Sequence, residues 1–367
     1  MAAQVLDRIE NQAPPNAKKK LVRRPAPDRS QRIRHLAQGL FVALNCWIAA
    51  QFYLWVRFFE QGGRGLYVSR PAGVEGWLPI AGLMNSICFL RTGSVPAIHA
   101  AAMFLFLAFV LMSLLLKKAF CSWLCPVGTF SEALWKLGRK LFGRNLRLPL
   151  WLDIPLRGLK YLLLGFFLFI IGSRSAEALK SFMVTPYGII ADVKMLNFFR
   201  DMSETAAIVI AVLVLASVLV KNFWCRYLCP YGALMGLVSF LSPVRIRRDT
   251  EACIDCGKCA KACPAALPVD RLVQIHSAEC AACMECVAVC PAENALQFSL
   301  PPRRAQASSE RWRRRVVGPA VFAGILAYIF LGMVLMARAT GHWQTALPQS
   351  VYMDLVPRAN AVTHPGM

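Results

Sequence analysis

Eight of the chain's 14 cysteines lie in two copies of one motif. The sequence reads CIDCGKCAKACP from Cys253 and CAACMECVAVCP from Cys280, and both runs have the spacing C-x2-C-x2-C-x3-C-P. In this bacterial ferredoxin spacing, three thiolates bind one [4Fe–4S] cluster and the fourth binds its neighbour. Zinc also binds C-x2-C pairs, but two complete tandem runs that end in proline favour iron and sulfur. We therefore expect cluster 1 on Cys253, Cys256, Cys259 and Cys290, and cluster 2 on Cys280, Cys283, Cys286 and Cys263.

Four further cysteines form a second, less specific motif. The sequences FCSWLCPVG, from Phe120, and WCRYLCPYG, from Trp224, each contain a C-x3-C-P pair. The thiols are those of Cys121, Cys125, Cys225 and Cys229. They could pack as small apolar groups beside prolines at helix starts, hold an additional metal centre such as a third iron–sulfur centre, or act as redox-active dithiols. Paired thiols at matched positions favour metal or redox use over packing alone.

Long apolar runs indicate that these motifs belong to a membrane protein. The chain is 57% hydrophobic, with a mean hydropathy of +0.46. Five runs can each cross a hydrocarbon core of ~30 Å, and they cover residues 36–56, 98–116, 156–172, 205–220 and 316–337. The segment GWLPIAGLMNSICFL, residues 76–90, is apolar but short and is interrupted by Pro79 and Gly82. We expect a re-entrant or interfacial helix there.

The distribution of Lys and Arg predicts the topology. The formal charge is +22, and 32 of the 42 Lys and Arg residues lie in residues 1–35, 117–160 and 221–315. By the positive-inside rule these parts face the cytoplasm of a bacterial inner membrane, and the C-terminus is periplasmic. Thiolate ligands need the same reducing compartment. Because no basic recognition module is interleaved with aromatic residues, we expect lipid contact and no nucleic-acid binding.

An internal repeat organises the membrane part. The order span, outer loop, span, Lys and then aromatic-C-x-aromatic-L-C-P-x-G occurs twice, which predicts a pseudo-two-fold axis along the membrane normal. We predict an α-helical integral membrane protein of about five transmembrane helices with a duplicated two-helix unit, joined to a small α+β two-[4Fe–4S] ferredoxin-like cytoplasmic domain. The expected divisions are a disordered basic arm (1–35), a four-span domain (36–244), the ferredoxin domain (245–302), a basic linker (303–315), a fifth helix (316–337) and a periplasmic tail (338–367).

With both C-x3-C-P pairs and both ferredoxin runs in this order, the chain resembles the polyferredoxin-type membrane proteins of bacterial respiration. That family includes NapH, MauN, the membrane half of NosR, CcoG and YccM-like proteins. The resemblance covers roughly residues 36–298. It implies that electrons pass between membrane quinol and a redox partner protein, such as a reductase or cytochrome, through cytoplasmic clusters.

Two other functions stay open. The resemblance to CcoG-like proteins implies copper reduction or maturation of a respiratory metalloenzyme, with the C-x3-C-P thiols handling the metal. A cluster-based redox sensor is the third hypothesis. No side chain stands out as a general acid, base or nucleophile, so an enzymatic role would rest on electron transfer alone, as in a quinol dehydrogenase component. Asp192, Asp201 and Glu204, on the outer side, could serve proton release, but their charges are interpreted as solvated loop charges.

Overall fold

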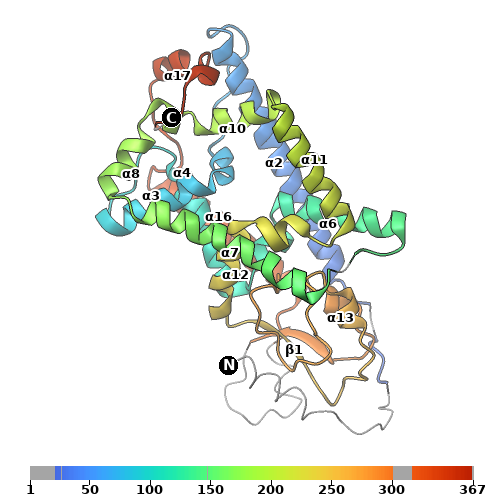
Figure 1. The fold of residues 1–367 in the computed structure, drawn as a ribbon. Helices are drawn as coiled ribbons and strands as arrows, with labels where there is room; N and C mark the ends of the chain where they lie inside the picture. Colours follow the sequence, from blue (N-terminus) through green and yellow to red (C-terminus); the bar gives the residue numbers. More distant parts are fainter. Residues whose placement is uncertain (1–20, 26, 147, 301–315, 366–367) are drawn as a thin grey trace.

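The computed structural model describes residues 21–25, 27–146, 148–300 and 316–365. The first 20 residues of the predicted arm and the predicted linker 303–315 lie outside the described residues. A large helical part stands above a small part that contains the two strands (Figure 1). The elements are α2 (Ser30–Glu60), η1 (Ala72–Trp77), α3 (Pro79–Thr92), α4 (Ala100–Leu116), α5 (Ala119–Trp123), α6 (Pro126–Phe142), α7 (Leu150–Gly172), α8 (Ala176–Met183), α9 (Pro186–Ile189), α10 (Ala191–Arg200), α11 (Glu204–Leu219), η2 (Trp224–Leu228), α12 (Pro230–Val238), η3 (Ser239–Leu241), β1 (Arg245–Arg248), α13 (Lys258–Ala262), α14 (Glu285–Ala288), β2 (Leu296–Ser299), α16 (Pro319–Ala339), α17 (Gln349–Leu355) and η4 (Ala359–Ala361).

Three helices are long and apolar enough to cross a membrane, namely α2, α7 and α16. A fourth crossing is possible if α10 and α11, which meet at a bend of 81°, act as one span. Helix α4 is apolar but has only 17 residues. All five predicted runs coincide largely with helices, while their count as five membrane crossings stays a prediction. The predicted outer segment is helical as α3.

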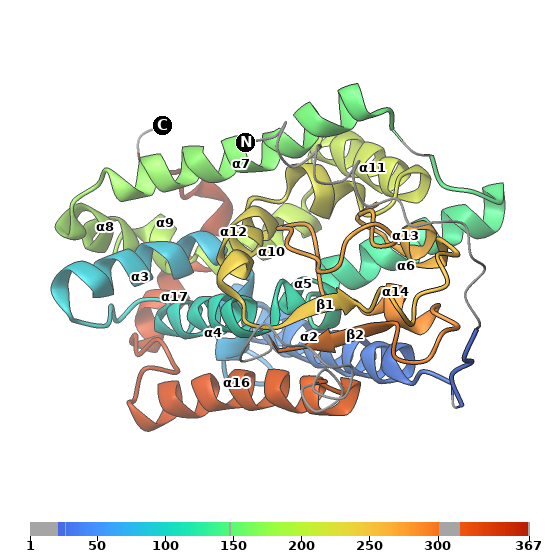
Figure 2. The same ribbon diagram turned by 90° about the horizontal axis from the view of Figure 1, so that it is seen from below.

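Helix α4 is the central helix of the membrane part. Its sequence, AAAMFLFLAFVLMSLLL, is apolar on every side, which is typical of a helix surrounded by protein. It packs against α3, α12 and α16, and Figure 2 shows it between α3 and α16. At its end the chain passes through Lys117 and Lys118 into the first C-x3-C-P pair.

In the two halves of the predicted repeat, the helix that follows each cysteine pair packs on a helix of the other half. Helix α6, which follows the first C-x3-C-P pair, packs on α11, whereas α12, which follows the second pair, packs on α4. The α6–α11 contact requires a glycine, because a Cβ on Gly138 would lie 1.8 Å from the carbonyl oxygen of Val218. This reciprocal packing brings the two cysteine pairs together, while the pseudo-two-fold axis stays a prediction.

In the sequence, the two ferredoxin motifs lie between strands β1 and β2. β1 and β2 pair antiparallel, with Arg245 opposite Ser299. The chain before α2 also joins this part, since the Arg24 amide donates to the Pro291 carbonyl at 3.1 Å and the Glu293 amide donates to the Val22 carbonyl at 2.9 Å. The described part of the predicted disordered arm therefore has fixed backbone partners, and α2 begins at Ser30.

A buried ion network ties the opposite end of the molecule together. Arg70 donates to Glu75 at 2.8 Å and to Asp192 at 2.6 Å, and both carboxylates are almost fully buried. His99 lies 3.2 Å from Glu75. The interpretation of Asp192 as a solvated loop charge is thus wrong, because Arg70 compensates its charge in the interior.

Candidate metal centres

The two C-x3-C-P pairs place their second cysteine in the same way, although the preceding turn is α-helical in the first pair (α5) and π-helical in the second (η2). In each pair the second cysteine caps a helix whose first residue is the proline, so Cys125 precedes Pro126 in α6 and Cys229 precedes Pro230 in α12. A proline costs nothing at this position because its missing N–H would have no helical partner. The amide of Cys125 donates to the carbonyl five residues earlier at 2.9 Å, and the amide of Cys229 does so at 3.0 Å. The repeated motif therefore places its second cysteine at a helix start in both halves.

Each motif also ends in a glycine that faces its cysteines. A Cβ on Gly128 would lie 2.1 Å from the carbonyl oxygen of Cys121, so no side chain fits there. At Gly232 the equivalent Cβ would lie 3.6 Å from the atoms of Cys225 and Cys229, which is an ordinary contact. The Gly232 amide donates to the Cys229 sulfur at 3.2 Å. Backbone N–H groups at both helix starts thus point at sulfur.

The four thiols of the C-x3-C-P pairs (Cys121, Cys125, Cys225 and Cys229; here the tetrad) come together. Burial raises the pKa of Cys121 to about 12, Lys118 opposes this change, and Cys125 and Cys229 add to it. Burial also raises the pKa of Cys225 well above its ordinary value, and charge repulsion from Cys229, Cys125 and Cys121 raises it further. Each half of the chain thus contributes two half-buried cysteines to one group of thiols.

The ferredoxin thiols line two separate cavities. Cys263, Cys280, Cys283 and Cys286 line one cavity of about 60 Å³, whose other walls include Ile246, Val269 and Ile275. Cys253, Cys256, Cys259 and Cys290 line a separate cavity of about 20 Å³. The fourth cysteine of each run joins the other run's cavity.

The tetrad lies directly against the loop that carries the Cys280–Cys283 pair. The Trp123 indole donates to the carbonyl of Ala282 at 3.1 Å, and the Ser122 hydroxyl donates to the carbonyl of Ala281. One cavity of about 70 Å³ has thiols of both groups on its wall, namely Cys121 and Cys225 of the tetrad and Cys283 of the ferredoxin part. The two thiol groups are therefore neighbours.

Two lysines between these thiol groups are buried. Lys117 is 0% and Lys118 is 5% exposed, although lysines that follow an apolar run are typical of a membrane boundary. Burial alone would lower the pKa of Lys118, but Cys121, Glu279 and the thiols of Cys225 and Cys229 outweigh it and raise that pKa. Glu279 also receives Lys160 Nζ at 2.6 Å.

Lys117 differs from its neighbour, because its Nζ has no hydrogen-bond partner among the described residues. Burial lowers the pKa of Lys117, the thiol of Cys280 opposes that change, and Arg245 adds to it. An isolated buried ammonium is costly, so an anionic group beside Cys280 would suit this site.

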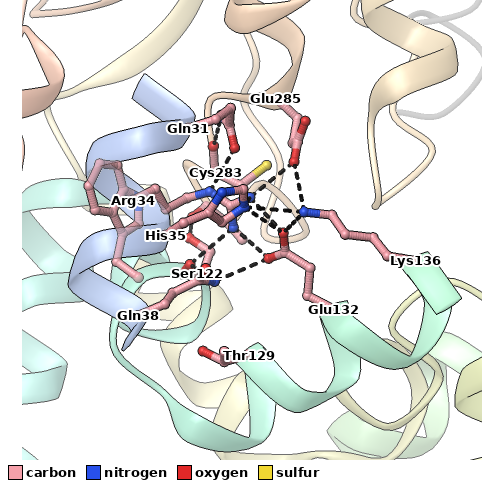
Figure 3. Close-up of polar contacts among 12 residues, drawn as sticks. Gln31, Arg34, His35, Gln38, Ser122, Thr129, Glu132, Lys136, Cys283 and Glu285 are labelled. Atoms are coloured by element: carbon pink, nitrogen blue, oxygen red, sulfur yellow. Dashed lines mark hydrogen bonds and ion pairs between the residues drawn. The ribbon is translucent and has the colours of Figure 1, made fainter. Parts of the chain in front are cut away.

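A cluster of charged side chains around Arg34 connects the loop that contains Cys283 to helices α2 and α6 (Figure 3). Arg34 on α2 donates to Glu132 on α6 at 2.7 Å and to Glu285 at 3.0 Å. Burial would raise the pKa of Glu132, but Arg34 and Lys136 lower it to about 2. The Gln31 amide donates to the carbonyl of Cys283 at 2.9 Å. These contacts hold the ferredoxin part in register with the membrane part.

The donor sets suit iron–sulfur clusters. Each of the two cavities presents four thiols. The buried, unpartnered Lys117 is influenced by Cys280 of one of them, whose thiol opposes the lowering of the Lys117 pKa by burial. In the described part of the chain, no three His, Cys, Asp or Glu side chains converge as they would around one metal ion. A cubane cluster is larger than one ion and holds its thiolates further apart. The sequence analysis missed the buried positions of Lys117 and Lys118 and the ion pair of Glu279. It also did not use the glycine of C-P-x-G, which both copies of the motif contain.

The comparisons with known proteins agree with this chemistry. The family described as 4Fe-4S binding domain matches residues 98–145 and 205–248, and each segment holds one C-x3-C-P pair. The family described as 4Fe-4S dicluster domain matches residues 245–291. No solved structure matches the chain.

Similar proteins extend over most of the chain. YccM of Escherichia coli, to which electron transport has been ascribed, is 50% identical over 90% of this chain and 91% of its own length. The ferredoxin-type protein NapH of Haemophilus influenzae is 26% identical over 69% of this chain and 91% of its own length. The methylamine utilization ferredoxin-type protein MauN of Methylorubrum extorquens is 29% identical over 54% and 65%, respectively. The chain therefore belongs to the NapH- and YccM-like family of ferredoxin-type, iron–sulfur electron-transport membrane proteins.

Proposed function

We propose that this protein relays single electrons between membrane quinol and a redox partner protein at the cytoplasmic face of the inner membrane. The observation that carries the proposal is the arrangement of 12 of the 14 cysteines in three groups of four, two of which share the wall of one cavity. The tetrad lies at the ends of apolar helices, and the Cys280–Cys283 loop packs against it. Cys256, in the third group, is exposed. Such a series connects a buried site to the protein surface.

In this proposal the ferredoxin part holds two [4Fe–4S] clusters. The ligands are Cys253, Cys256, Cys259 and Cys290 for cluster 1, and Cys280, Cys283, Cys286 and Cys263 for cluster 2. When bound, each cluster gains or loses one electron without forming or breaking a substrate bond. The chain supplies apolar walls, as at Ile246 and Val269, and fixes the loops through contacts such as that of Gln31.

We assign the tetrad to a third metal centre. The charges around it support this assignment over a purely structural or disulfide role. Lys118 faces the thiols from within the protein, while Glu279 is shared with the fully buried Lys160. Glu279 can compensate only one of the two buried lysines, Lys118 and Lys160. Thiolates bound to a metal carry negative charge that compensates the other lysine, whereas two neutral disulfides would leave one buried cation in excess.

The relay is tested by electron exchange with a quinone. Reduced protein, freed of excess reductant and kept anaerobic, is mixed with a quinone analogue. Each quinone takes up two electrons and two protons to become quinol, so we expect loss of the reduced-cluster signal in proportion to the quinone added. The reverse reaction, with a quinol analogue and oxidised protein, covers the opposite direction of flow. Absence of exchange in both directions would refute the relay.

Two control reactions separate the competing functions. Copper(II) reduction that is lost in Cys121→Ser or Cys225→Ser, while the ferredoxin clusters persist, would favour metal reduction or metalloenzyme maturation. Stable clusters without turnover with quinone or copper would favour a redox sensor. The relay instead predicts quinone exchange that falls in both serine variants.

A further inference from the structure

Lys117 is a buried cation without a conventional partner. Its side chain is 0% exposed, and its Nζ has no hydrogen-bond partner in the described chain. Buried charges in proteins are normally paired and hydrogen-bonded, because the interior solvates an isolated ion poorly. An unpartnered ammonium in this position therefore points to a negative group that binds beside it.

The residues near Lys117 suggest one candidate for that negative group. The segment that follows Lys117 packs on the loop that begins at Cys280, because Ser122 and Trp123 donate to the carbonyls of Ala281 and Ala282. Burial lowers the pKa of Lys117, the nearby thiol of Cys280 opposes that change, and the cation Arg245 adds to it. Cys280 lines the cavity of the second thiol group together with Cys263, Cys283 and Cys286. Four thiolates around a [4Fe–4S] core give the bound group a net negative charge, which becomes one unit more negative on reduction.

The backbone of Lys117 is held in an unusual conformation. Its φ of 60° and ψ of −165° lie in a region that is essentially reserved for glycine. The Lys117 amide donates to the Ser242 hydroxyl at 3.0 Å, and that hydroxyl donates to the carbonyl of Leu115 at 3.0 Å. The Lys117 carbonyl accepts from the Ala119 amide at 2.7 Å. Non-glycine residues persist in this region where the surroundings fix them, often at functional sites.

The equivalent lysine of the second half lacks these properties. Lys221 also follows an apolar run and precedes a C-x3-C-P pair, but it is half-buried and its Nζ donates to the carbonyl of Lys261 at 3.4 Å. The left-handed φ of the second half falls on Asn222 instead. The lysine before the C-x3-C-P pair is therefore fully buried only in the first half of the repeat, and this burial is not a general property of the motif.

From these observations we infer that Lys117 is the counter-charge of cluster 2 and raises its reduction potential. The inference rests on the proposed binding of a cluster by Cys263, Cys280, Cys283 and Cys286. One-electron reduction adds one negative charge to the cluster, and the fixed ammonium stabilises that state more than the oxidised state. No bond or proton transfer is required. Lys117 thus acts on the cluster through its charge and does not bind iron.

The test is a redox titration of the purified holoprotein against an electrode, followed by EPR. It compares wild type with Lys117→Met, which removes the charge at similar length, and with Lys221→Met as the matched control. Cys256→Ser, which perturbs cluster 1, assigns the two midpoint potentials. We expect Lys117→Met to reduce the equilibrium constant for reduction of cluster 2 at least tenfold, about 59 mV for one electron. Cluster 1, and both clusters in Lys221→Met, should keep their midpoints.

A second neutral variant keeps the test decisive if Lys117→Met folds poorly. Lys117→Gly removes the charge but suits the observed backbone, so it should fold and show the same shift. Loss of cluster 2 in both neutral variants, with cluster 1 and the charge-retaining Lys117→Arg intact, would also support the inference. An unchanged midpoint of cluster 2 in either neutral variant, or loss of both clusters together, would overturn it. Wild-type protein without iron would refute the proposed function instead.

Discussion

Gly128 and Gly232 occupy the same position of the two C-x3-C-P-x-G motifs, and alanine should have opposite effects on them. A Cβ at Gly128 would lie 2.1 Å from the Cys121 carbonyl oxygen, against an ordinary contact that begins at 3.4 Å. The backbone must therefore shift by about 1.3 Å, the difference between these distances. At Gly232 the nearest atoms lie at 3.6 Å and nothing has to move.

The magnitude follows from two opposing contributions. Both glycines lie in the first turn of a helix, where alanine is favoured over glycine by ~0.5–1 kcal/mol. Gly232→Ala should therefore be neutral or slightly stabilising. Overpacking costs ~1–3 kcal/mol, and a clash with backbone belongs near the upper end, so Gly128→Ala should lower the free energy of unfolding by about 2 kcal/mol.

Thermal unfolding in detergent and metal content per chain measure these effects. Because Cys121 must move with its carbonyl, Gly128→Ala should also lose metal from the tetrad, whereas Gly232→Ala should retain it. Equal unfolding temperatures and equal metal content in the two variants would refute the reasoning that the first motif needs a glycine at this contact.

Two buried ion pairs give further predictions, both read by thermal unfolding. Glu279→Gln leaves the ammonium of the fully buried Lys160 without its carboxylate, and should cost ~3–5 kcal/mol, while the exposed Asp354→Asn should cost less than ~1 kcal/mol. Glu75→Gln should destabilise the opposite end by a similar ~3 kcal/mol because it leaves Arg70 undercompensated. Burial would raise the pKa of Glu75, but Arg70 and its neighbours lower it to about 2 from 4.5. This contribution is present above pH 4.5 and is lost as the pH falls towards 2, so the wild type and Glu75→Gln should converge in acid.

The helices and the ferredoxin groups were predictable from the sequence because both depend on local patterns. Apolar runs determined where helices such as α2 and α16 lie, and the C-x2-C-x2-C-x3-C-P spacing anticipated which thiols share a cavity. The crossing count was less predictable, since α4 is apolar on every side yet has 17 residues and is surrounded by protein. Apolar composition alone does not distinguish a lipid-facing helix from one buried among helices.

The charged residues were the least predictable part. Lysines after an apolar run are typical of a membrane boundary, and this pattern alone cannot show that Lys117 and Lys118 turn inward. Asp192 likewise lies in a loop region by sequence, while its partner Arg70 is far away in the chain. Long-range pairing decided each of these positions, so the sequence offered no local signal for them.

Iron and acid-labile sulfide per chain, counted with EPR, test the central claim most directly. The comparison is between the wild type and a variant with serine at Cys121, Cys125, Cys225 and Cys229. Two [4Fe–4S] clusters account for about eight iron atoms, so the variant should keep about eight and the wild type should hold more. About eight in both proteins would contradict the third centre. Zinc in place of iron at the ferredoxin cysteines would contradict the electron-transfer account as a whole.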